Sequence, residues 1–275
     1  RRGTVRCLTL AICTILNKAQ AMPAVEQGMP DLGVAPEGEA LGAADRGTSP
    51  ADHAALLSAW LSPNFPIGGY AYSGGLERAV EAGLVTNEAE LAAWLSALID
   101  HGALRNDIIL LANAAGASPG AAFDDIAALG AALQPTAERY QEATAQGEAF
   151  TQIFFSTWRA QAPGPCPLAP YANNAAPITL PCAFAGAVNA FAISPRDAAL
   201  AYAVATLNNQ ISAAIRLSII GQIGGQRLLA GAFPTMRAAI CKLADAPLSA
   251  LGSAAMMADI CSMQHETQTV RLFQS

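Results

Sequence analysis

Three residues near the end of the chain are of the types that bind transition metals. Cys261 and His265 are four positions apart, so they would share one face of a helix, and Glu266 follows directly. Together they could supply thiolate, imidazole and carboxylate ligands. Two residues on a helix face make a weak site, and a buried cysteine beside a histidine that caps the helix or faces a partner is the simpler interpretation. We therefore assign no metal site.

Catalytic and nucleotide-binding motifs are missing from the sequence. No histidine belongs to an HExxH motif, and no lysine follows the glycine spacing of a P-loop. The segment GQIGGQ, residues 221–226, has the glycines of a phosphate-binding loop without their spacing, and a tight turn between helices is favoured there. No Ser or Cys lies in a nucleophile motif, although a triad assembled in space cannot be read from sequence. The residues thus offer no recognisable catalytic constellation, and we assign no catalytic residues and no cofactor. None of these motifs contains any of the three histidines, His53, His101 and His265, or either of the two lysines, Lys18 and Lys242.

The sequence SPNFPIGGYAYSGGLE, residues 62–77, is the most unusual stretch of the chain. Residues 65–68 fit a type I turn with proline second and glycine fourth. Gly68 and Gly69 let the backbone pass close to another group, and Ser73 can cap a short helix over residues 74–82. Tyr70 and Tyr72 would be displayed on this turn. A helix-to-helix corner packed on the core and an interaction site are both compatible with the pattern.

The composition indicates that apolar surface is covered inside the molecule or by partners. Hydrophobic residues make up 53% of the 275 residues and charged residues only 13%, against roughly 25% in typical soluble domains. A symmetric homodimer is one way to cover such a surface. The net charge of −6 offers no electrostatic footprint for nucleic acid or an anionic membrane. No run of about 20 apolar residues predicts a membrane span.

Residues 1–50 are expected to lie outside the folded domain, which we place at residues 51–275. Arg1, Arg2 and Arg6 precede an apolar stretch, residues 7–16, in the pattern of a secretory signal. The favoured interpretation is upstream sequence translated in error, with Met22 or Met29 as the true start. Residues 22–50 are rich in Pro, Gly and acidic groups and predict a disordered leader.

Apolar periodicity predicts helices through the rest of the chain. The clearest covers residues 194–220, with Ser194 as the cap, Pro195 in the first turn and Asp197 near the positive end of the helix. Asn87 caps either one helix or two that are kinked near Gly102. Residues 160–177 are proline-rich and read as a long irregular connection. The prediction is an all-α fold, a single bundle of roughly eight to ten helices. The other predicted helices cover residues 134–158, 179–191, 222–233, 235–244 and 248–265.

Three separated blocks of the sequence resemble, in order, the UreF family of urease accessory proteins. They are NFPIGGYAYSGGLERAVEAGLV, NNQISAAIRLSIIGQIGGQRLL and LGSAAMMADICSMQHETQTVRLFQS. The resemblance implies an all-helical, cytoplasmic and non-enzymatic protein that dimerises. It also implies a bridge between UreD, called UreH in some organisms, and the GTPase UreG, in an assembly that delivers nickel to apo-urease. An alternative function is a nickel-binding metallochaperone that uses Cys261, His265 and Glu266.

The resemblance also suggests which residues bind partners. Gln264 and Gln274 depart from the family, which often has arginine there, and Cys261 replaces what is commonly alanine. The expected partner-binding residues are Gly68, Gly69, Tyr70, Tyr72, Ser73, Glu77, Arg216, Gln222, Gln226, Arg227, His265, Glu266, Arg271, Leu272 and Phe273.

The last residues, TVRLFQS, are unusually apolar for the end of a chain. Such side chains either pack back onto the bundle or dock into a groove of a partner. We favour docking, with Leu272 and Phe273 as the apolar anchors and with Arg271 and Glu266 at the polar rim.

Overall fold

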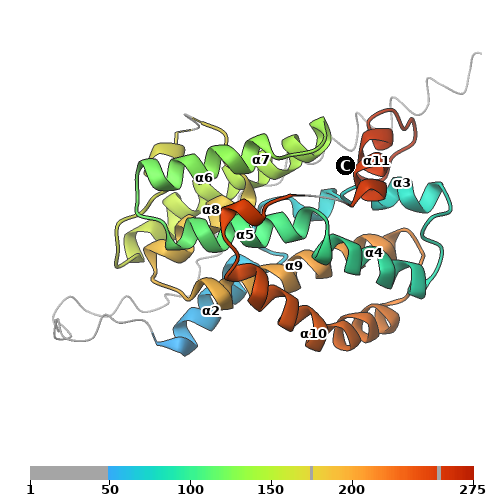
Figure 1. Cartoon of the computed structure of the whole chain (residues 1–275), viewed down its shortest axis with the longest axis horizontal. Coiled ribbons are helices and arrows are strands. Elements are labelled where there is room, and N and C mark those ends of the chain that lie inside the picture. The colour runs from blue at the N-terminus through green and yellow to red at the C-terminus, as the bar shows by residue number, and fades with distance from the viewer. Residues whose placement is uncertain (1–48, 174–175, 253–254) are drawn as a thin grey trace, which may run out of the picture. The chain divides into compact units, whose positions relative to one another are not determined.

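A computed structural model describes residues 49–173, 176–252 and 255–275, and within these ranges every regular element is helical (Figure 1). The all-α prediction is confirmed. None of the described helices combines the length and the apolar character that a membrane-spanning segment needs. The helices are α2 (Pro50–Trp60), α3 (Leu76–Glu81), α4 (Glu88–Asp100), α5 (Ala103–Gly116), α6 (Ala121–Ala132), α7 (Ala137–Ile153), α8 (Leu180–Ala190), α9 (Pro195–Arg216), α10 (Gln222–Ala244) and α11 (Met256–His265). Short turns are η1 (Gly69–Ala71), η2 (Phe154–Trp158), η3 (Arg159–Gln161), η4 (Ala169–Tyr171) and η5 (Leu248–Ala250).

The core is built around α5, which packs against α8, α9 and α10. The helix α8 is buried from Pro181 to Val188, because it is covered by α5 and α7 as well as by the proline-rich segment. Small residues let these elements approach closely: a Cβ on Gly147 would lie 2.0 Å from the carbonyl oxygen of Ile178. Alanine and glycine thus set the helix spacing, while large aliphatic side chains fill the layers between helices.

An aromatic cluster anchors α2 and the loop that follows it. The buried ring of Trp60 makes edge-on contacts with Phe154 at 5.9 Å, with Phe184 at 6.3 Å and with Phe191 at 5.2 Å between ring centroids. These rings come from η2, α8 and the turn after α8, so one side chain at the end of α2 joins three segments.

The start of α2 corrects the predicted leader boundary. Ser49 and Pro50, which were assigned to residues 1–50, begin this helix through a capping box: Asp52 N–H donates to Ser49 Oγ at 3.2 Å, and Ser49 N–H donates to Asp52 at 2.8 Å. The rest of the predicted leader, residues 1–48, lies outside the described residues.

Two capping predictions are confirmed in detail. Ser194 accepts the Asp197 N–H at 3.4 Å with Pro195 in the first turn, and Asn87 accepts the N–H of Glu90 at 3.1 Å. The pattern over residues 87–116 resolves into two helices, α4 and α5. They are separated at Gly102, where a Cβ would lie 2.9 Å from the Cα of Leu98.

Other predicted boundaries differ from the structure. The segments 222–233 and 235–244 form one helix, α10, with Pro234 inside it. Pro234 lies on the exposed side, where the carbonyl that loses its N–H partner can face water. The segment 248–265 is instead η5 and α11, and between them Gly252 N–H donates to the Asn106 side chain at 3.0 Å. The predicted helix over 134–158 begins at Ala137, capped by Thr136. The Ala-rich helix α6 was not among the predicted elements.

Candidate functional site

The Gly-Gly loop, residues 62–75, forms a surface projection with a buried base. Phe65 is buried against Phe150, with 5.2 Å between the ring centroids, whereas Tyr70 is 73% exposed. The predicted type I turn is wrong: the Ile67 N–H donates to the Phe65 carbonyl at 2.8 Å, which closes a tighter, three-residue turn. Gly68 then adopts a left-handed φ of 71° and starts η1.

The loop is held from below by α9. The side chain of Asn209 donates to the Tyr72 carbonyl at 3.3 Å, and Gln210 Nε2 donates to the Ser73 carbonyl at 2.9 Å. Tyr72 is half-buried, and its burial raises the pKa of its hydroxyl. The second block that resembles the family, residues 208–229, therefore supports the first block, residues 64–85.

The second glycine pair allows the loop to cross two other segments. Gly75 has a φ of 85°, and a Cβ there would lie 2.9 Å from the backbone nitrogen of Ser262 in α11. Gly74 also has a positive φ, and it passes over the side chains of Arg139 and Gln210. The short helix begins at Leu76 rather than at residue 74, although Ser73 Oγ still accepts the Glu77 N–H at 3.2 Å as a cap would.

A buried ionic cluster lies where α3, α7 and α11 meet. His265 is fully buried, and its Nδ1 lies 2.8 Å from Glu138 Oε2 while its Nε2 lies 3.2 Å from Glu77 Oε2. Arg271 Nη1 donates to Glu138 at 2.6 Å. Since carboxylates accept hydrogen bonds, this arrangement fits an imidazole ring that donates from both nitrogens. The charges compensate one another, which is what burial requires.

The tail, residues 266–275, packs back onto this cluster and onto the Gly-Gly loop. Phe273 is 3% exposed, and the guanidinium carbon of Arg216 lies 4.2 Å from the centroid of its ring. Ser275 Oγ donates to Glu142 at 2.6 Å, and the Ser275 carbonyl accepts both the N–H and the hydroxyl of Ser73. All three family-like blocks therefore meet at one junction.

This packing corrects the expectation that Leu272 and Phe273 would both be free anchors for a partner. Phe273 is inserted into the bundle because Glu77 accepts the backbone N–H groups of Leu272 and of Phe273 itself, and because Arg216 covers its ring. Leu272 is 61% exposed, and Val270 is 82% exposed. Of the apolar tail residues, only these two present their side chains at the surface.

Four of the expected partner-binding residues are buried in this structure: Ser73, Glu77, His265 and Phe273. These four side chains make their hydrogen bonds and packing contacts within the chain. They therefore hold the neighbouring exposed residues in place and do not themselves form a binding surface. Among the others, Gly68, Gly69 and Tyr72 are partly exposed, and the rest are exposed.

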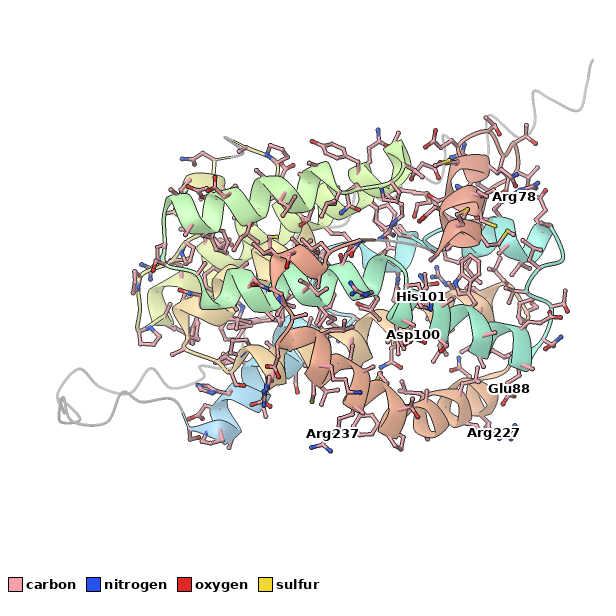
Figure 2. The ribbon with its side chains drawn as sticks, in the orientation of Figure 1. Arg78, Glu88, Asp100, His101, Arg227 and Arg237 are labelled. Atoms are coloured by element: carbon pink, nitrogen blue, oxygen red, sulfur yellow. The ribbon has the colours of Figure 1, made fainter. Side chains whose placement is uncertain are left out.

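The middle block is divided between two places. Arg216 reaches the tail, but Gln222, Gln226 and Arg227 lie on the first turns of α10, which packs against α9, α5 and α4. Figure 2 shows Arg227 beside Glu88 of α4, and the two side chains are 3.4 Å apart. The structure thus does not bring all the expected residues together.

One apolar surface was missed by the sequence reasoning. Met256, Met257, Ile260 and Met263 are exposed on α11 and form what we call the methionine face. Positions 256, 260 and 263 recur at helical spacing, which is the signal that could have identified it. Methionine side chains adapt to irregular partners, so such a face suits protein binding.

The three residues considered as metal ligands are engaged in other contacts. Cys261 is buried, both nitrogens of His265 face carboxylates, and Glu266 Oε1 accepts the Ala137 N–H at 3.1 Å. Over the part of the chain that the structure describes, no group of three or more His, Cys, Asp or Glu residues is placed to hold a metal ion.

Comparison with known proteins gives one consistent result. Residues 85–233 match the family model of UreF. A urease accessory protein UreF of Methylobacterium sp. (strain 4-46) is 44% identical over 227 residues, which cover 81% of this chain and 88% of that protein. Those of Methylobacterium radiotolerans and Rhodopseudomonas palustris (strain HaA2) are 41% and 44% identical, each over 80% of this chain and over 95% and 92% of their own lengths. The chain belongs to the UreF family of urease accessory proteins.

Proposed function

We propose that this protein is a cytoplasmic, non-catalytic scaffold of urease maturation that bridges UreD (or UreH) and UreG during nickel insertion into apo-urease. Membership of the UreF family and the names of its relatives support a role in urease maturation. The observation that carries the scaffold role is the junction itself. The buried cluster holds α11 and the tail together, and the hydrogen bonds from Ser73 to Ser275 hold the tail to the Gly-Gly loop. Exposed side chains from all three are therefore presented in fixed positions.

The docking surface that we propose consists of exposed groups around this junction. Tyr70 supplies an aromatic side chain, the methionine face supplies adaptable apolar area, and Leu272 extends that area onto the tail. Arg271 and Glu266 provide a polar rim, as at other interfaces. The buried residues Ser73, Glu77, His265 and Phe273 would affect partner binding indirectly, by holding this surface in shape.

A second proposed surface is the exposed side of the first two turns of α10, residues 222–227. Ile223 is 79% exposed beside Gln222, Gln226 and Arg227, which the family resemblance marked as partner-binding. Two separate surfaces are what a bridging protein needs, because each partner must bind without displacing the other.

We further propose that the protein is a homodimer, and light scattering at micromolar concentration should give twice the mass of one chain. A monomeric mass would contradict this.

Co-purification of the full chain with UreD and UreG tests the scaffold role. Tyr70→Ala and Leu272→Asp should each weaken capture of one partner by at least about tenfold. Phe233→Ser on α10 is a matched control, because it also removes an exposed apolar side chain but lies outside the proposed surfaces.

Equilibrium dialysis with Ni²⁺ should find no tight stoichiometric site. A tight site that Cys261→Ala abolishes would favour the metallochaperone instead.

A further inference from the structure

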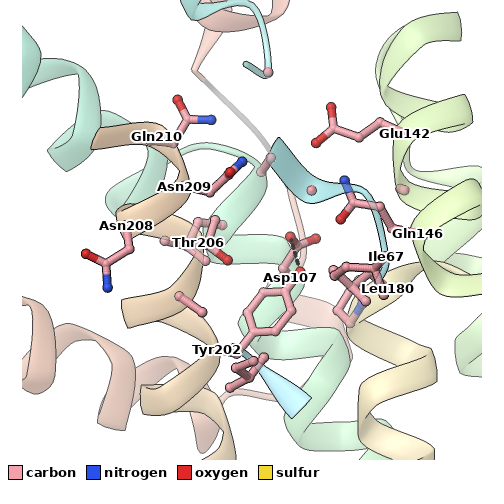
Figure 3. Close-up of a pocket in the computed structure, with 18 of the residues that line it drawn as sticks. Ile67, Asp107, Glu142, Gln146, Leu180, Tyr202, Thr206, Asn208, Asn209 and Gln210 are labelled. Carbon is pink, nitrogen blue, oxygen red and sulfur yellow. Dashed lines mark hydrogen bonds between the residues drawn. The ribbon is translucent and has the colours of Figure 1, made fainter. Parts of the chain in front are cut away.

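A cavity of about 300 Å³, with largely apolar walls and a few polar side chains, lies beneath the Gly-Gly loop (Figure 3). Its inner wall comes from α5, α7 and α9, and its lining includes Pro63, Tyr70 and Asn208, which are exposed and so place its mouth at the surface. The polar side chains that matter here are Asp107, Arg139, Glu142, Tyr202, Thr206 and Gln210.

Gln210 leaves one polar atom of this cavity without a partner. The side chain is 8% exposed, and its Nε2 donates to the Ser73 carbonyl at 2.9 Å, which fixes the orientation of the amide. Oε1 therefore cannot turn away, and no hydrogen-bond donor of the described residues reaches it. Buried polar groups are normally satisfied, so unpaired ones in a cavity point to an occupant.

The charges of the cavity favour a cation. Arg139 Nη1 lies 2.5 Å from Glu142 Oε2, so its charge is compensated within α7. Asp107 accepts a hydrogen bond from the hydroxyl of Tyr202 at 3.1 Å, and no cationic side chain of the described residues forms an ion pair with it. Burial raises the pKa of Asp107 to about 6, and the positive charge of Arg139 opposes this rise. Asp107 is therefore mostly ionised at neutral pH. Asp259 of α11 adds a further acidic residue to the lining.

We propose that this cavity binds a guanidinium group. Asp107 would pair with the cation, while Gln210 Oε1 and the Thr206 hydroxyl would accept its remaining N–H groups. A guanidinium is planar and weakly hydrated, so it suits a cavity whose other walls are apolar or aromatic, such as Leu180 and the ring of Tyr202. A metal ion suits it less, since no group of three or more His, Cys, Asp or Glu among the described residues is placed to coordinate one.

The guanidinium can come from an arginine side chain of a partner or from a free small molecule. The exposed Tyr70 at the mouth lies on the surface proposed for partner docking, so the first source rests on the proposed function. Arginine inserted into a pocket beside an aromatic side chain is a common anchor of protein interfaces.

Titration of the full chain with methylguanidine, followed by NMR, tests the chemistry of the cavity. Saturable binding in the millimolar range is expected at neutral pH, with N-methylurea, which is neutral and nearly the same shape, binding at least about tenfold more weakly. Asp107→Asn should weaken methylguanidine binding at least tenfold, whereas Tyr202→Phe should keep it, because the carboxylate remains. Equal binding of the two compounds, or unchanged binding by Asp107→Asn, would overturn the proposal.

Acidification provides a second readout, in the unaltered protein, that does not depend on any substitution. Methylguanidine binding should weaken as the pH falls through about 6, since Asp107 then becomes neutral. Glu142 and Asp259 also face the cavity, and Arg139 and Tyr202 stay protonated in this range. Binding that is the same on both sides of this pH would count against Asp107 as the pairing group.

Capture of UreD and UreG by the Asp107→Asn variant then distinguishes the two sources. Loss of both methylguanidine binding and capture of one partner would identify a partner arginine. Loss of methylguanidine binding alone would identify a free small molecule. If the unaltered chain captures neither partner, the scaffold proposal fails, while the titration still decides whether the cavity binds guanidinium.

Discussion

The carboxylate of Glu77 accepts the backbone N–H of Leu272 at 2.6 Å, although the two residues are 195 positions apart in the sequence. The same carboxylate accepts the Phe273 N–H at 2.9 Å and lies 3.2 Å from His265. One side chain of the short helix α3 therefore satisfies the tail backbone and a buried imidazole together, and the tail depends on it.

Replacing Glu77 by Gln should destabilise the protein by about 2 to 4 kcal/mol, because an amide nitrogen would face donors and His265 would lose a charged partner. Urea denaturation measures the loss, and limited proteolysis should cut the tail faster. Glu81→Gln in the same helix is the control. Its exposed ion pair with Arg78, at 2.7 Å, should contribute no more than about 1 kcal/mol. Equal effects of the two substitutions would contradict the role of Glu77.

Phe273→Ala should cost about 3 kcal/mol of unfolding free energy, since it removes a buried ring and its contact with Arg216. Leu272→Ala, one position away and 61% exposed, should change stability by less than about 0.5 kcal/mol. Thermal melting of the isolated protein compares the two. If Phe273→Ala melts like the unaltered chain, the tail is not part of the core in solution.

Gly75→Ala should destabilise by about 1 to 3 kcal/mol, because a φ of 85° is strained for alanine and its Cβ would contact the backbone of α11. Gly231→Ala in α10 makes the same chemical change with nothing within 4 Å. There alanine should stabilise by about 0.5 to 1 kcal/mol, through its higher helix propensity. Denaturant midpoints of the two variants should move in opposite directions.

The elevated pKa of Asp107, about 6, makes a prediction about pH. A carboxyl group whose pKa is higher in the folded state than in the unfolded state destabilises the protein once the pH rises above the unfolded value and through the folded one. Asp107→Asn should therefore raise the melting temperature near neutral pH, by an amount worth up to about 3 kcal/mol, and have little effect near pH 4. A stabilisation that is equal at both pH values would exclude ionisation of Asp107 as its cause.

The local structure was largely predictable where one short segment contains its own signal. The cap at Ser194, the Asn87 cap and the break at Gly102 follow from side chains and backbone that lie within a turn of one another. Predictions were wrong where tertiary context decides. Pro234 does not end α10. Gly252 does not join α11, because its N–H donates to the side chain of Asn106 in α5.

The sequence by itself determined the all-helical class, the absence of recognisable catalytic motifs and the three blocks that mark the family, because composition, periodicity and motifs are local properties. Only the tertiary structure decided which contacts the three blocks make with one another. It buries His265 and Phe273, exposes Leu272 and the methionine face, and leaves Gln210 Oε1 without a hydrogen-bond partner among the described residues. Burial and pairing arise from contacts between residues as distant as Ser73 and Ser275, and no local pattern specifies which partner a buried charge or an apolar ring will meet.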